Sequence, residues 1–80
     1  MDFKEATELV GKLKDKLDND TLLKLYGFFK QATIGDINIT RPWPWQVKEC
    51  SKYDAWLSVK GMKQSDAEEE YISIVKELNK

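Results

Sequence analysis

The chain has 80 residues, of which 41% are hydrophobic and 34% charged, and its formal net charge at pH 7 is −1. A chain of this length and composition is expected to form one small domain over residues 1–80, and it is too apolar to be disordered. The near-neutral charge argues against nucleic-acid binding, because no global basic field is present to attract phosphates.

Three features of the sequence indicate a cytoplasmic protein. Cys50 is the single cysteine and has no internal disulfide partner, so we interpret it as a partly buried small residue rather than a redox centre. The N-terminal residues Met1 to Lys4 lack the apolar run of a signal peptide. No segment reaches the ~20 apolar residues that a membrane span requires.

A first helix is predicted to begin at Phe3. Its apolar residues recur at steps of three and four, which is the spacing of one helical stripe. They are Phe3, Ala6, Val10, Leu13 and Leu17. Asp2 and Glu5 predict an N-cap with a partial capping box. Gly11 costs about 1 kcal/mol relative to alanine inside a helix, so it marks either close packing or a gap for a ligand.

A second helix is predicted after a cap at Asn19-Asp20, and Gly35 is expected to end it in a left-handed conformation. Seven of the eleven positions 22–32 are apolar, namely Leu22, Leu23, Leu25, Tyr26, Phe28, Phe29 and Ala32. This is too many for one stripe, so two faces of the helix must be covered. Either a ligand covers the second face, or the helix is simply central to the fold.

Residues 36–44 are expected to form a long loop, because Pro42 and Pro44 disfavour helix there. A third helix should begin near Trp45 and end at Lys60-Gly61, with Trp56 in the core. A fourth should open with Ser65-Asp-Ala-Glu68 as a capping box. Its apolar stripe is Ala67, Tyr71, Ile74, Val75 and Leu78. No strand pattern is present, and four amphipathic helices predict an all-α bundle.

The loop segment Arg41-Pro-Trp-Pro-Trp45 allows two interpretations. We favour packing, with Trp45 beneath the loop and Trp43 covering it. The alternative is exposure of both rings, which would suit contact with a membrane surface or with the apolar end of a ligand.

No catalytic site stands out in this sequence, although lysine, tyrosine and carboxylate side chains could catalyse in principle. The sequence has no histidine and a single cysteine, so no Ser-His, Cys-His or histidine-rich metal constellation can form. The carboxylates are scattered rather than paired in a motif. We therefore expect neither an enzyme nor a bound metal or cofactor.

A binding site is predicted on the second helix instead. Tyr26, Phe29 and Lys30 are three and four residues apart and fall on one helical face. This face carries a hydroxyl, a flat ring and an ammonium group. Such a set can hold a phosphate beside a nucleobase, with the ring as the stacking surface.

Several motifs together resemble one known family. They are Tyr26-x-x-Phe-Lys-Gln-Ala-Thr-Ile-Gly-Asp-Ile-Asn38, Arg41-Pro42, Lys52-Tyr-Asp-Ala-Trp56, Lys60-Gly61, Asp66-Ala67 and Tyr71. At these spacings the chain resembles the acyl-CoA-binding protein family over nearly its whole length. The resemblance implies a four-helix up-down-down-up bundle, in which the long second loop makes helices two and three run the same way.

The resemblance also implies roles for particular residues. Tyr26, Lys30 and Lys52 would contact the 3′-phosphate and ribose of coenzyme A, Phe29 would stack on the adenine, and Tyr71 would complete the nucleotide pocket. Further residues would line the acyl groove, with Ala6, Leu22 and Leu23 along it and Lys16 and Lys48 near its rim. The chain departs from the family where Phe29 replaces a tyrosine, Tyr53 a tryptophan and Gly11 a lysine.

The function implied by this resemblance is that of a monomeric carrier of medium- and long-chain acyl-CoA esters, with transient contacts to membranes or to enzymes that use the ester. One alternative is a small helical protein-interaction module whose aromatic groove accepts an amphipathic helix. A second is a nucleotide-binding domain that is indifferent to the acyl tail. Binding of an acyl-CoA ester, compared with free coenzyme A, would separate the three.

Overall fold

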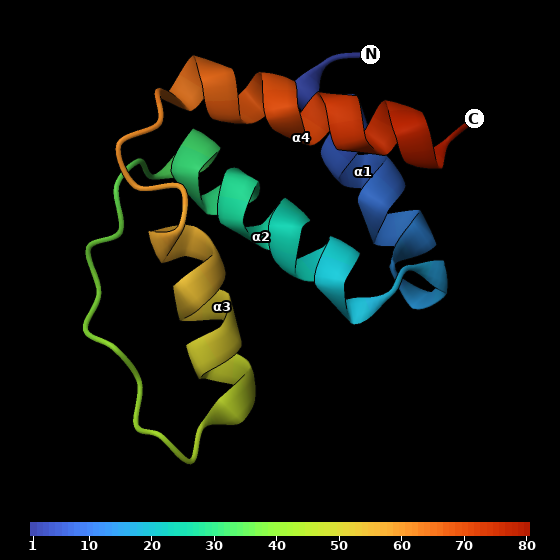
Figure 1. The fold of residues 1–80 in the computed structure, drawn as a ribbon. Coiled ribbons are helices and arrows are strands. Elements are labelled where there is room, and N and C mark those ends of the chain that lie inside the picture. Colours follow the sequence, from blue (N-terminus) through green and yellow to red (C-terminus); the bar gives the residue numbers. More distant parts are fainter.

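Four α-helices and one short 3₁₀ helix make up the fold in the computed structural model, which describes all of residues 1–80 (Figure 1). The elements are α1 (Phe3–Leu13), η1 (Lys14–Lys16), α2 (Asn19–Thr33), α3 (Val47–Leu57) and α4 (Gln64–Leu78). The long loop between α2 and α3 returns the chain, so these two helices run in the same direction (Figure 1). The predicted up-down-down-up bundle is confirmed. No helix combines the length and hydropathy needed to span a bilayer.

Helix α2 is the central element, because it packs against both α3 and α4, while α1 packs on α4. This position explains why so many of its residues are apolar. The contact with α3 is especially close at Gly27, where an added Cβ atom would lie 2.6 Å from the carbonyl oxygen of Ala55. Only a residue without a side chain allows the two backbones to approach this far.

The core lies where α1, α2 and α4 meet. Ala6, Leu25, Tyr71 and Val75 form its buried cluster, and Leu17 packs against that cluster from beyond the end of α1. Trp56 is 2% exposed, as predicted, and its indole Nε1 donates a 2.9 Å hydrogen bond to the carbonyl oxygen of Gly35.

The predicted N-caps are partly wrong. Asp2 caps α1, since its carboxylate accepts from the backbone N–H of Glu5 at 2.8 Å. Helix α2, however, is capped by Asp18, which accepts from the Thr21 N–H at 2.8 Å; the predicted Asn19-Asp20 already lies inside the helix. Asp18 is the N-cap residue because its backbone is still extended, with φ −74° and ψ 165°, whereas Asn19 is already the first helical residue.

The predicted capping box at the start of α4 does not form. The helix begins at Gln64, and Lys63 is the N-cap residue without a side-chain cap. Lys63 is the last residue with an extended backbone, so Ser65 already lies inside the helix and cannot act as its N-cap. The stripe that begins at Ala67 is nevertheless buried at Ala67, Tyr71 and Val75.

Helix α3 is shorter than predicted at both ends. It begins at Val47 rather than Trp45, because Pro44 and Trp45 occupy a turn. It ends at Leu57, and residues 58–61 form tight turns in which the Val59 N–H bonds to the Trp56 carbonyl. The two glycine predictions at helix ends are confirmed in part: Gly35 and Gly61 have φ values of 101° and 93°.

The two tryptophans of the loop are exposed, so the packing interpretation is wrong. Trp43 is 65% exposed and Trp45 is 74% exposed. Their rings stack on each other, with centroids 5.2 Å apart and planes 2° from parallel. The turn explains this arrangement, because the Gln46 N–H bonds to the Trp43 carbonyl at 2.9 Å and the Gln46 side chain accepts from the Trp43 N–H.

Replacing Gly27 with alanine is expected to destabilise the protein by about 1–3 kcal/mol, because the new methyl group forces α2 and α3 apart. Denaturant unfolding of both proteins measures the difference. The matched control is Gly11→Ala in α1, where an added Cβ meets no atom within 4 Å. This change should stabilise the protein by up to about 1 kcal/mol. A Gly27→Ala protein as stable as the control would contradict the close-contact account.

Candidate functional site

Three of the predicted head-group residues lie together where α2 contacts α3. The Lys30 Nζ lies 5.8 Å from the centre of the Tyr26 ring, and the Lys52 Nζ lies 5.7 Å from it. Tyr26 and Lys30 are one turn apart on α2, as their spacing predicted. Lys52 comes from α3, and the close helix contact at Gly27 brings it to the same ring.

Neither of these lysines has an acidic partner. The salt bridges in the structure join Arg41 to Asp54 and Lys80 to Glu77, and neither Lys30 nor Lys52 takes part in one. Lys30 also lies 5.6 Å from the Trp56 ring. Two ammonium groups held over aromatic faces and not neutralised by carboxylates form a local positive centre, which suits a phosphate.

The Tyr26 hydroxyl is available as a hydrogen-bond donor at neutral pH. Burial raises the pKa of this phenol above its usual value, and the negative charge of Glu49 raises it further. Burial likewise raises the pKa of Tyr71. Both side chains therefore stay protonated across the physiological range, and the Tyr26 hydroxyl can donate to an anion beside the two lysines.

Aromatic rings form the second part of the site. The Tyr71 ring centre lies 6.3 Å from that of Phe29 and 5.2 Å from that of Phe3, in a tilted and an edge-on arrangement respectively. Tyr71 is 3% exposed, whereas Phe29 is 37% exposed. Buried Tyr71 thus packs against Phe29, and Phe3 stacks on the Phe29 ring with centroids 6.1 Å apart, which leaves the exposed part of Phe29 for a planar group.

Two hollows flank this cluster. The first, of about 190 Å³, is lined by Val10, Leu22, Leu25, Tyr26, Phe29 and Tyr71. The second, of about 440 Å³, is lined by Asn19, Leu23, Val47, Lys48, Ser51 and Lys52. Tyr26 lines the first and Lys52 the second, so the contact between these two residues stands between an aromatic hollow and a larger hollow of mixed character.

The hollows bring together most of the predicted site residues. Tyr26, Phe29 and Tyr71 share the first hollow with Leu22, while Lys52, Leu23 and Lys48 share the second. Three predicted residues line neither hollow. Lys30 lies beside the Tyr26 ring, Ala6 is fully buried in the core, and Lys16 is exposed on η1.

The comparison with known proteins decides the family. A family model described as Acyl CoA binding protein matches residues 1–75. The chain belongs to the acyl-CoA-binding protein family. It is 43% identical over 76 residues to the acyl-CoA-binding protein of Dictyostelium discoideum, a match that covers 95% of this chain and 90% of that protein.

Other members of the acyl-CoA-binding protein family give the same result. The acyl-CoA-binding protein of Saccharomyces cerevisiae is 42% identical over 76 residues, which covers 95% of this chain and 87% of that one. The crystal structure of Oryza sativa acyl-CoA-binding protein 2 superposes with a TM-score of 0.92 at 39% identity, covering 96% of this chain and 84% of that chain. The resemblance seen in the motifs is confirmed at the level of family and fold.

A hydrogen-bond network that sequence reasoning missed supports the site of this acyl-CoA-binding protein. Gln31 is 1% exposed, and its Nε2 donates to Asp36 Oδ1 at 2.9 Å and to the Met62 carbonyl at 2.7 Å. Asp36 Oδ1 also accepts from the Gly61 N–H at 2.8 Å. The network ties the end of α2, one residue after Lys30, to the turn before α4. The sequence signal that could have revealed this network was Gln31, a polar residue within an apolar stretch of the predicted second helix.

The Asp36 carboxylate should make folding stability sensitive to acid. The hydrogen bond from Gln31, and next the one from Gly61, lower the pKa of Asp36 below its usual value. Its stabilising contribution is therefore present above the unfolded-state pKa of about 3.9 and is lost as pH falls through the lower folded-state pKa. Asp36→Asn should remove this dependence, so the stability gap between wild type and variant should narrow as pH falls below about 4.

Urea unfolding at a series of pH values between neutral and strongly acidic measures this gap. Asp15→Asn is the control, because Asp15 is exposed and makes no hydrogen bond or ion pair. A gap for Asp36→Asn that stays constant across the series would show that the Asp36 charge contributes nothing through this network.

Proposed function

We propose that this chain is a non-catalytic carrier that binds medium- and long-chain fatty acyl-CoA esters. Family membership and the names of its relatives support this proposal. The observation that carries it is the arrangement of Lys30 and Lys52 about Tyr26, without carboxylate partners and between two hollows. A fatty acyl-CoA has a polyanionic nucleotide and an apolar tail, and the site offers a surface for each.

The head group is assigned to the cationic cluster and the rings beside it. Tyr26, Lys30 and Lys52 would bind the 3′-phosphate and ribose, because they supply one hydroxyl and two ammonium donors around one position. Phe29 would stack on the adenine, with Tyr71 supporting it. A charge-assisted hydrogen bond to a phosphate contributes about 1.5 to 3 kcal/mol.

The acyl tail is assigned to the apolar surface along α2, where Leu22 and Leu23 line separate hollows and Lys48 lies at the rim of the larger one. Burial of each methylene contributes about 0.8 kcal/mol, so ten methylenes contribute about 8 kcal/mol before ordering costs. Tail burial therefore sets the affinity, and the head group sets identity and orientation.

In the cell, such a carrier would act as a monomer in the cytoplasm and would require no cofactor. It would buffer the free ester, shield the tail from water, and deliver the ester to lipid-metabolising enzymes through transient contacts with them or with membranes. The family match favours this carrier over a protein-interaction module.

Calorimetric titration with palmitoyl-CoA and with free coenzyme A tests the proposal. The carrier predicts saturable one-to-one binding of the ester and much weaker binding of free coenzyme A, because only the ester buries a tail. Equal binding of the two would indicate a nucleotide-binding domain instead. If both titrations gave only heats of dilution, the carrier proposal would be refuted and the protein-interaction module would remain.

Lys30→Ala and Lys52→Ala should each weaken binding of the ester about ten- to a hundred-fold, because each removes one charge-assisted contact to the phosphate. The order of preference across esters of increasing chain length should stay unchanged, since the tail contacts are untouched. Dephospho-coenzyme A esters should show the same loss with wild-type protein. Titration calorimetry measures all three.

Lys24→Ala is the matched control, because Lys24 is exposed on α2 and is not one of the two lysines over the Tyr26 ring. Its affinity for the ester should equal that of wild type. Altered chain-length preference in Lys30→Ala or Lys52→Ala would refute the division of roles between head group and tail.

A further inference from the structure

The exposed side chains of Trp43, Trp45 and Val47 form a surface that we call the tryptophan patch. These side chains are 65%, 74% and 69% exposed, respectively. The two indole rings cover part of each other but nothing of the core. Large apolar residues exposed together on a small domain are unusual and mark a contact surface.

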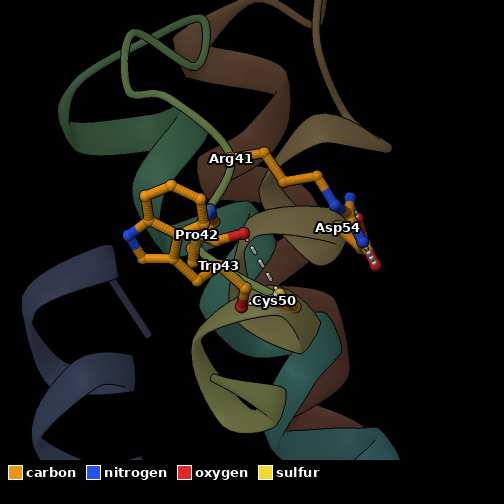
Figure 2. Close-up of polar contacts among 5 residues, drawn as sticks. All are labelled: Arg41, Pro42, Trp43, Cys50 and Asp54. Atoms are coloured by element: carbon orange, nitrogen blue, oxygen red, sulfur yellow. Dashed lines mark hydrogen bonds and ion pairs between the residues drawn. The ribbon is translucent and has the colours of Figure 1, made fainter. Parts of the chain in front are cut away.

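The patch is held in place by the protein rather than carried on a free loop. The Cys50 thiol faces the backbone carbonyls of Trp43 and Pro42, at 3.4 Å and 3.7 Å (Figure 2). On the other side of the segment, Arg41 reaches Asp54 on α3 and forms an ion pair with it (Figure 2). Because both anchors lie on α3, the rings are presented with little ordering left to occur on binding.

The charges beside the patch indicate what it contacts. Lys48 and Lys52 lie on the first turns of α3 and take part in no salt bridge, and Glu49 is the one carboxylate between them. Residues 41–54 hold three cationic side chains and two acidic ones; with Arg41 paired to Asp54, Lys48 and Lys52 remain against Glu49, although the whole chain has a net charge of −1. This end of α3 is therefore locally basic on a slightly acidic protein.

We propose that the tryptophan patch docks this protein onto the surface of anionic phospholipid bilayers. Indole rings suit the boundary between headgroups and acyl chains, and unpaired lysines beside them attract anionic lipid headgroups.

The position of the patch links docking to the carrier role, and this step alone rests on the proposed function. Val47 belongs to the patch and also lines the larger hollow with Leu23 and Lys48. A docked protein would thus hold the mouth of that hollow against the lipid. An acyl tail that moves between the bilayer and this hollow would then be exposed to water over the shortest distance.

Vesicle co-sedimentation tests the docking without any ligand. Wild-type protein is expected to sediment with phosphatidylcholine vesicles that contain phosphatidylserine, and to bind pure phosphatidylcholine at least about tenfold more weakly. The double variant W43A/W45A should lose at least about tenfold in binding to the anionic vesicles. Lys48→Ala should reduce binding and weaken its dependence on salt.

Ile39→Ala is the matched control, because Ile39 is 51% exposed in the same loop and lies outside the patch. It should bind vesicles as wild type does. Far-ultraviolet circular dichroism establishes that each variant is folded. Tryptophan emission of wild type should shift to shorter wavelength on the anionic vesicles, whereas W43A/W45A, which keeps only buried Trp56, should show no shift.

Two results would overturn the proposal: wild type that stays in the supernatant with anionic vesicles, or W43A/W45A that sediments as wild type does. A palmitoyl-CoA titration without vesicles tests the other interpretation, in which the two tryptophan rings cover the acyl tail of the ligand. If W43A/W45A loses ester affinity but keeps vesicle binding, the rings cover the acyl tail and the docking proposal is refuted. If wild type sediments with vesicles but binds no ester, docking stands and the carrier function fails.

Discussion

The close contact between α2 and α3 at Gly27 is the constraint on which the rest of the site depends. The Ala55 carbonyl occupies the space that a side chain at position 27 would need. At this separation, Lys52 on α3 reaches the Tyr26 ring, which α2 presents next to Gly27. A wider spacing of the helices would leave Lys30 and Lys52 as two unrelated surface lysines, with no shared centre for an anion.

The C-terminal ends of α2 and α3 are fixed by two further interactions. The Trp56 indole donates to the Gly35 carbonyl, and Gln31 joins Asp36 to the turn before α4. These hydrogen bonds fix where the chain leaves α2 and where it leaves α3. The long loop between them is therefore fixed where it begins, and the Arg41–Asp54 ion pair and the Trp43–Gln46 turn fix it before α3.

Local spacing predicted much of this protein, and tertiary contacts account for what it missed. Tyr26, Phe29 and Lys30 could be grouped from the helical period, but Lys52 joined them only through the motif, since no periodicity connects two helices. The α2 cap was misplaced by one residue because Asp18, Asn19 and Asp20 are all good capping residues. The tryptophan rings were misassigned because composition favours burial, while hydrogen bonds in the Trp43–Gln46 turn direct them outward.

The two cation–π contacts at Tyr26 have a consequence for the entropy of anion capture. A lysine side chain carries about 2 kcal/mol of rotamer entropy, much of which a freely moving side chain loses when it grips a ligand. Here both ammonium groups already rest against one ring face or edge, within 6 Å of its centre. Part of this rotamer entropy is therefore lost when the chain folds, so less of it has to be lost when a phosphate binds to the two lysines.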